Sequence, residues 1–158
     1  SQESLVNLQL QIKNKIASRN YLAIVHGVPQ KSEGTIVGNI GRHPSNRKKY
    51  AVVKNESGRY ACTHWKFIEN FGNYSLISFK LDTGRTHQIR VHCSHINHPI
   101  VGDPLYGRCR KIPCSLNGQA LHANKLGLIH PIKGNEMIFE AEMPPELQKL
   151  IKVIKKRI

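Results

Sequence analysis

The hydrophobic pattern changes its period at Asp82-Thr83-Gly84, and this change constrains the fold more than any other feature of the sequence. Before the turn, apolar residues alternate with polar ones, as in a strand with one buried face: Ile77, Phe79 and Leu81. After the turn, they follow the spacing of one helical face: Ile89, Cys93 and Ile96. The sequence therefore predicts a strand, a turn and a helix over 74–96, with Thr83 as a candidate helix cap.

The same patterns predict the remaining elements. Helices are expected over 1–18 and 144–156, and the apolar stripe of the first one needs a surface to cover. Further strands are expected at 21–26, 51–54, 61–69, 120–129 and 137–141, the last two as a hairpin. The polar segment 41–50 is expected to be a loop. The 158 residues are thus expected to form a single α/β (α+β) domain, with a mixed, largely antiparallel sheet and flanking helices.

Charge narrows the class of partner. The chain has 24 Lys and Arg against 10 Asp and Glu, a formal net charge of +14. Such an excess favours a polyanion, because phosphate groups attract Lys and Arg and release counterions. The densest basic segment holds the candidate nucleic-acid contacts Arg42, His43, Arg47 and Lys48. A solvated basic surface without a nucleic-acid partner is the alternative. For the lysines of the last helix, a solvated face is the more frequent case.

Polar side chains gather where the central helix is expected to begin. Arg85, Thr86, His87 and Gln88 add donors to a helix start that already favours anions. Arg90 falls at the margin of the buried face, where a guanidinium requires a carboxylate partner. An ordinary capped surface helix is the alternative reading of this segment.

Several other functions lack their sequence signals. There is no phosphate-binding Gly-x-x-x-x-Gly-Lys-Ser/Thr loop and no Gly-x-Ser-x-Gly nucleophile turn. His92, His95 and His98, with Cys93, lack the paired spacing of structural zinc ligands, so no metal is expected. The four cysteines form no disulfide framework, and a reduced, cytoplasmic protein without membrane spans is expected.

Three ordered motifs resemble those of the RluA-type RNA pseudouridine synthases. The first runs from Thr83 to His92, the second from His98 to Gly107, and the third is Ala120-Leu121-His122-Ala123 with His130-Pro131. The strand that holds Tyr21 and the Arg42-His43-Pro44 segment extend the resemblance over nearly the whole chain. The chain is most similar to the branch that modifies uridines in 23S rRNA of the large ribosomal subunit.

The resemblance implies an isomerisation without a cofactor, in which a flipped-out uridine loses its glycosidic bond and is rejoined to the ribose through C5. Tyr21 matches the family's aromatic residue that stacks on the base and is implicated in removing the C5 proton. Arg90 matches the arginine that pairs with the nucleophilic aspartate. Leu121, from the third motif, is expected among the RNA contacts.

The sequence departs from the family at the nucleophile. No His-Arg-Leu-Asp motif occurs, and the two aspartates, Asp82 and Asp103, fall inside other motifs. We therefore expect residues 1–158 to be the C-terminal portion of a catalytic domain, without the nucleophile motif and without an S4 module. This portion is expected to be a monomer that binds ribosomal RNA without isomerising uridine. A non-catalytic, basic RNA-binding module is the alternative.

Overall fold

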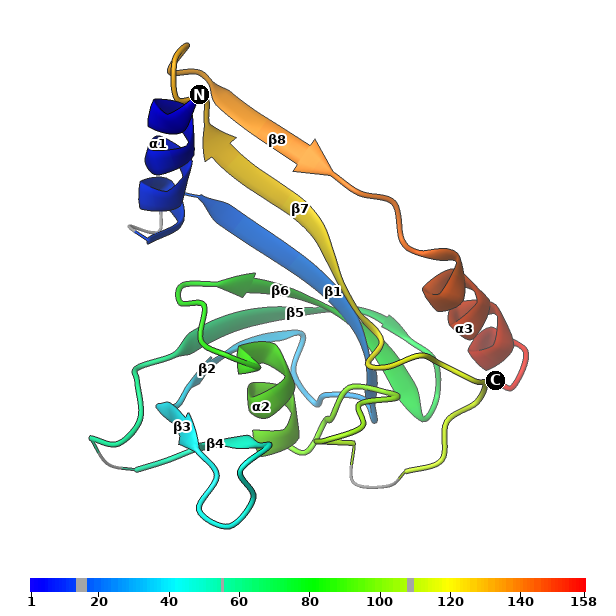
Figure 1. The fold of residues 1–158 in the computed structure, drawn as a ribbon. Helices are drawn as coiled ribbons and strands as arrows, with labels where there is room; N and C mark the ends of the chain where they lie inside the picture. The colour runs from blue at the N-terminus through cyan, green and yellow to red at the C-terminus, as the bar shows by residue number, and fades with distance from the viewer. Residues whose placement is uncertain (14–16, 55, 108–109) are drawn as a thin grey trace.

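A six-stranded antiparallel sheet forms the centre of the computed structural model, which describes residues 1–13, 17–54, 56–107 and 110–158 (Figure 1). The strands are ordered β2-β5-β6-β1-β7-β8. Their bounds are β1 Ser18–His26, β2 Glu33–Val37, β5 Cys62–Asn70, β6 Tyr74–Leu81, β7 Leu121–Ile129 and β8 Glu136–Glu140. The antiparallel sheet with helices around it confirms the predicted fold class.

Three helices and a small second sheet complete the fold: α1 Gln2–Lys13, α2 Gln88–His95, α3 Pro145–Lys155, β3 Ile40–Arg42 and β4 Tyr50–Val52. The pair β3 and β4 corrects the predicted loop at 41–50, because its two ends pair as a hairpin and only the tip is irregular. Among the described residues, no helix is long and apolar enough to cross a membrane.

The core lies around the C-terminal half of β1. Ala23, Ile24 and Val25 are fully buried, and because successive strand residues point to opposite faces, both faces of the sheet are covered here. Helix α2 contributes Ile89 and Cys93, and helix α3 contributes Leu147, Leu150 and Ile154. This packed end of the sheet supports the residues that the motifs single out.

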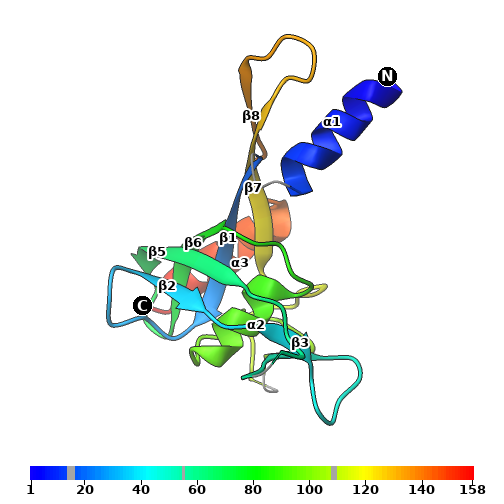
Figure 2. The ribbon, with the colours of Figure 1, turned by 90° about the vertical axis from the view of Figure 1, so that its left-hand side faces the viewer.

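Helix α1 differs from its expectation. Its apolar stripe, predicted as Leu5, Leu8, Ile12 and Ile16, was expected to cover a surface, but Leu5 and Ile12 remain about half exposed. The helix stands beside the far ends of β7 and β8 (Figure 2). Its anchor is polar: the Gln11 side chain donates to the carbonyl of Ile129 and accepts from its N–H, at 2.5 and 2.7 Å. Ile16, the last residue of the predicted stripe, lies outside the described residues.

Candidate functional site

The start of α2 is organised by one buried amide. The Gln88 Oε1 accepts from the Thr83 hydroxyl at 2.7 Å and from the Arg85 N–H at 2.9 Å, and its Nε2 donates to the carbonyl of Cys62 and to Thr63. Thr83 therefore ties the turn to the helix through a side chain, while His87, in the left-handed region at φ 57°, occupies the N-cap position. This corrects the prediction of Thr83 as the helix cap.

A directional chain of hydrogen bonds continues from this amide into the core. Gln88 donates to the Thr63 hydroxyl, and that hydroxyl lies 2.8 Å from the Nδ1 of His92. The Nε2 of His92 lies 3.0 Å from the carbonyl oxygen of Gly38, which can only accept, so Nε2 carries the proton. Burial lowers the pKa of His92, which agrees with a neutral ring in this chain.

Arg90 has the carboxylate partner that its position requires. Its Nε and one terminal nitrogen each donate to an oxygen of Asp103 at 2.8 Å, a bidentate ion pair. The Arg90 side chain is 11% exposed and the Asp103 side chain is completely buried. The expectation that Arg90 pairs with a carboxylate is confirmed, and the partner comes from the second motif.

Asp103 has no spare capacity for covalent chemistry in this arrangement. Besides Arg90, its Oδ1 accepts from the backbone N–H groups of Leu105 and Tyr106. Burial alone would raise the pKa of Asp103, but the hydrogen bonds from Arg90 and the backbone outweigh burial and lower it. The residue is thus a fixed, ionised anchor for Arg90, which agrees with its exclusion as the nucleophile.

Tyr106 joins three parts of the site. Its hydroxyl accepts from the backbone N–H of Tyr50 and lies within 2.9 Å of His87 Nδ1, while its ring lies 5.1 Å from the Arg90 guanidinium carbon. Burial and the charge of Arg90 lower the pKa of His87, so a neutral ring can accept from the tyrosine hydroxyl. Tyr106 thereby connects the β3–β4 hairpin, the start of α2 and the Arg90 ion pair.

The β3–β4 hairpin presents the predicted basic residues. Arg42, Arg47 and Lys48 are exposed, and the Arg42 guanidinium lies 4.6 Å from the centre of the Tyr50 ring. His43 has a local role, because its Nδ1 accepts from the backbone N–H groups of Ser45 and Asn46 and shapes the hairpin tip. The cations are therefore displayed on a loop with defined internal hydrogen bonds.

Tyr21 and Leu121 share one face of the sheet. Tyr21 pairs with Ala123, and Ala23 pairs with Leu121, so the two side chains stand two residues apart on neighbouring strands. Both are half-buried. A cavity of about 260 Å³ is lined by Tyr21 but not by Arg90. Among the described residues, no hydrogen bond or ring contact joins Tyr21 to Arg90, the two residues that were predicted to be catalytic.

Two residues of the Tyr21 cavity were missed by sequence reasoning. Arg19 lines it and passes close to Gly84, where an added Cβ would lie 2.5 Å from a guanidinium nitrogen. Asn124 lines it from the bulge in β7, and its Oδ1 is a buried acceptor without a hydrogen-bond partner among the described atoms. Arg19 could have been predicted, because it lies two residues before Tyr21 and therefore on the same face of the strand. Asn124 could not, because its position depends on a bulge that the sequence does not signal.

The remaining predicted contacts divide by exposure. Thr86 is exposed, and Arg85 and His87 are half-buried, with Arg85 Nε donating to the carbonyl of Tyr60. Gln88 is only 3% exposed and its amide is fully used inside the fold, so its role here is structural and it is not presented to RNA. Two of the histidines that were rejected as zinc ligands have other hydrogen-bond partners. His92 lies in the chain from Gln88 to Gly38, and the His98 ring lies 2.8 Å from the carbonyl oxygen of His26.

Comparison with known proteins places this arrangement in a family. The family model described as RNA pseudouridylate synthase matches residues 1–95. An uncharacterized RNA pseudouridine synthase of Synechocystis is 47% identical over 98% of this chain and 48% of that protein. The ribosomal large subunit pseudouridine synthase D of Zymomonas mobilis is 43% identical over 93% of the chain and 48% of that protein. The chain thus spans about half the length of these relatives.

The fold agrees with these relationships. The structure of human RNA pseudouridylate synthase domain containing 4 superposes with a TM-score of 0.79 over 98% of this chain and 69% of that chain, at 20% identity. That similarity concerns the fold alone, but the relatives above are similar in sequence over almost all of this chain. The motif-bearing strand and helix, the Arg90 ion pair and the matched residues 1–95 thus lead to one conclusion: the chain belongs to the RNA pseudouridylate synthase family.

Proposed function

We propose that this chain is the part of an RNA pseudouridine synthase that positions the target uridine, and that the parent enzyme isomerises uridines of large-subunit, 23S-type ribosomal RNA. The observation that carries the proposal is the sheet face that holds Tyr21 and Leu121, at which Tyr21 lines a cavity of about 260 Å³. An aromatic ring and an aliphatic side chain on one face offer stacking surfaces to a flipped base. The name of the Zymomonas relative supports the choice of RNA.

In the proposed reaction, the N1–C1′ bond of uridine breaks, the base turns, and C5 forms the new bond to C1′. The proton leaves C5 and N1 is protonated, so no oxidant and no cofactor are required. In this reaction Tyr21 stacks on the base and assists removal of the C5 proton. In this proposal the nucleophile is a carboxylate outside residues 1–158, because Asp103 is occupied by Arg90 and two backbone N–H groups and Asp82 lies 2.7 Å from the ring of His64.

The RNA backbone is held by the charged residues of the β3–β4 hairpin. The exposed Arg42, Arg47 and Lys48 stand on the hairpin that a hydrogen bond from the Tyr50 N–H joins to Tyr106. Thr86 and Arg85 extend this surface at the start of the helix. Phosphate contacts of this kind fix the register of the RNA without reading its sequence.

The decisive experiment is release of tritium from 5-tritiated uridine in ribosomal RNA. We expect no release from residues 1–158 alone, and release from a longer parent chain that adds a His-Arg-Leu-Asp motif. Tyr21→Ala in that longer chain should abolish release while leaving RNA binding nearly intact. Release by residues 1–158 alone would refute an external nucleophile.

A non-catalytic RNA-binding module remains the second candidate, favoured by the net charge of +14 and by the full occupancy of Asp103. The two candidates differ in the parent polypeptide. If the longer chain binds ribosomal RNA but releases no tritium, the binding module is the better account.

A further inference from the structure

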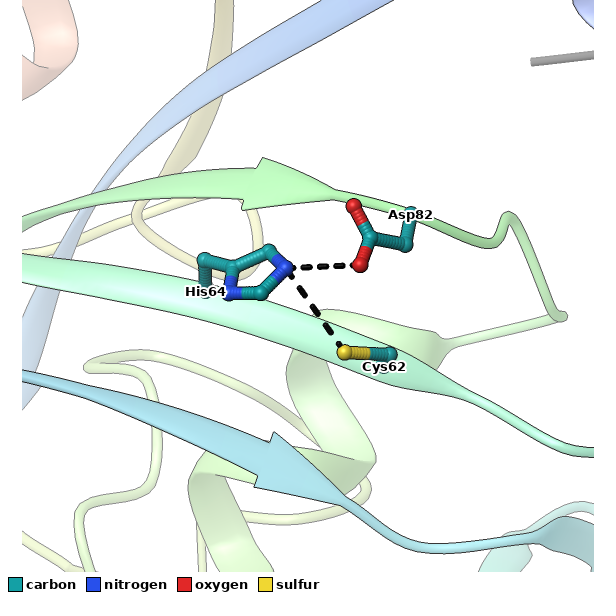
Figure 3. A group of neighbouring side chains, drawn as sticks. All are labelled: Cys62, His64 and Asp82. Carbon is teal, nitrogen blue, oxygen red and sulfur yellow. Dashed lines mark hydrogen bonds and ion pairs between the residues drawn. The ribbon is translucent and has the colours of Figure 1, made fainter.

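The side chains of Cys62, His64 and Asp82 meet at one point of the sheet and offer a sulfur, a nitrogen and an oxygen atom to a metal ion. The Nε2 of His64 lies 2.7 Å from an oxygen of Asp82 and 3.7 Å from the sulfur of Cys62 (Figure 3). Among the described residues, the thiol, imidazole and carboxylate ligand atoms all lie within 4.8 Å of one another. A thiol, an imidazole and a carboxylate are the three side-chain ligands that zinc prefers.

The backbone sets this convergence. Cys62 and His64 are two residues apart on β5, so they point to the same face of the sheet. Asp82 directly follows β6, which pairs with β5, and its N–H donates to the carbonyl of Cys62 at 3.2 Å. Two adjacent strands therefore hold the three ligands. The His64 and Asp82 side chains are both about half exposed, whereas Cys62 is buried.

The other ring nitrogen of His64 has the partner that a metal-bound histidine requires. Its Nδ1 lies 3.0 Å from the Thr35 hydroxyl on β2. A hydroxyl can either donate or accept. When Nδ1–H donates to Thr35, the lone pair of Nε2 is available to a metal. In zinc sites, the second ring nitrogen of a bound histidine commonly donates to an oxygen in this way. Without a metal, Nε2–H can instead donate to Asp82.

The spacing and the charge fit a divalent ion of the zinc type. Tetrahedral zinc with bonds of about 2.0–2.3 Å separates its ligand atoms by roughly 3.4 Å. The distance from His64 to Cys62 is close to this value, and the distance from His64 to Asp82 has to open slightly. A thiolate and a carboxylate neutralise the ion, which matters because Lys80 lies directly across from His64 in the sheet. Binding releases the thiol proton of Cys62.

We propose that Cys62, His64 and Asp82 form a three-ligand site for Zn²⁺. The fourth position is open to solvent, since His64, Asp82 and Thr35 line a cavity of about 770 Å³. The ion links β5 to the Asp82-Thr83-Gly84 turn, so it stabilises the segment that leads into α2.

The test is metal binding by the 158-residue chain after removal of metals with a chelator. We expect one equivalent of Zn²⁺ by calorimetry. With Co²⁺ as the probe, we expect the visible absorption of a tetrahedral ion together with a thiolate charge-transfer band. Thr35→Val should weaken binding about 10-fold, the size of effect typical of a second-shell partner.

Ligand variants decide the assignment. Cys62→Ser should remove the charge-transfer band, and Asp82→Asn should weaken Zn²⁺ binding by more than the ~10–100-fold of a second-shell loss. Cys114→Ser, a cysteine on another part of the chain, is the matched control and should bind as wild type. Asp82 is exposed, so its variant reports on the site even if Cys62→Ser fails to fold. Equal Zn²⁺ affinity for wild type and Asp82→Asn, or a Co²⁺ complex without thiolate absorption, would overturn the proposal.

Discussion

The two ends of the molecule satisfy their side chains in opposite ways. Around α2, buried polar groups such as Asp103 and Gln88 are hydrogen-bonded, and the helix buries Ile89, Val91 and Cys93. Around α1 and the β7–β8 hairpin, large apolar side chains are exposed: Leu5, Val6, Leu10, Ile12, Ile129, Ile132, Ile138 and Phe139. The end around α2 buries most of its apolar surface. The end around α1 buries little apolar surface, so it adds little to the stability of the described part of the chain.

The largest effect is expected from Asp103→Ala. It leaves the guanidinium of Arg90, only 11% exposed, without its carboxylate, and two backbone N–H groups without their acceptor. Losing one partner of a buried ion pair costs about 3–5 kcal/mol in the free energy of unfolding. Urea denaturation followed by circular dichroism measures this loss. Glu140→Ala, which breaks an exposed pair with Lys125, should cost no more than about 1 kcal/mol. Equal losses would contradict the contrast between the two ends.

Paired leucine truncations test the same contrast in the apolar residues. Leu150→Ala in α3 removes a completely buried side chain and should cost about 2–5 kcal/mol. Leu10→Ala in α1 removes one that is 48% exposed and should change stability by about 0.5 kcal/mol or less. Thermal and urea unfolding of both variants provide the measurement. A loss at Leu10 as large as that at Leu150 would show that α1 packs more tightly than the structure indicates.

The pH dependence of stability should come from the packed end. Burial lowers the pKa of His26, His87 and His92 below the ordinary 6.5, so the unfolded chain binds more protons in mildly acidic solution. Stability is therefore complete above pH 6.5 and falls as the pH decreases through the lowered pKa values. Asp103, whose pKa is also lowered, adds a further loss at more acidic pH. Urea midpoints measured against pH test this, and His92→Gln should flatten the first phase. A midpoint that rises on acidification would have the wrong sign.

The smallest effect concerns RNA binding. Lys48→Ala on the β3–β4 hairpin should weaken all RNAs alike and reduce the salt dependence of binding by about one unit, as for the loss of one phosphate contact. Lys133→Ala, in the turn between β7 and β8, removes the same charge at the other end and should leave the slope unchanged. Filter binding at several salt concentrations distinguishes them. An unchanged slope for Lys48→Ala would remove this lysine from the RNA contacts.

Local patterns were sufficient for most elements. The alternation at 74–81 and the helical spacing after Gly84 predicted β6 and α2, because each pattern reflects burial of one face of a single element. They were insufficient at 41–50, where a hairpin forms because Tyr50 gains a partner in the distant Tyr106. The cap at Thr83 was wrong for a similar reason, since its hydroxyl is used by the Cys62 N–H from another strand.

The sequence by itself determined the class of fold, the excess of basic residues and the need of Arg90 for a carboxylate. These follow from composition, local periodicity and the cost of a buried charge, which involve one residue and its neighbours in the chain. Only the tertiary structure decided that Asp103 is the partner, that Gln88 faces inward, and that Cys62, His64 and Asp82 converge. Those facts depend on strand register and on the packing of distant segments, and no local pattern encodes which distant groups will meet.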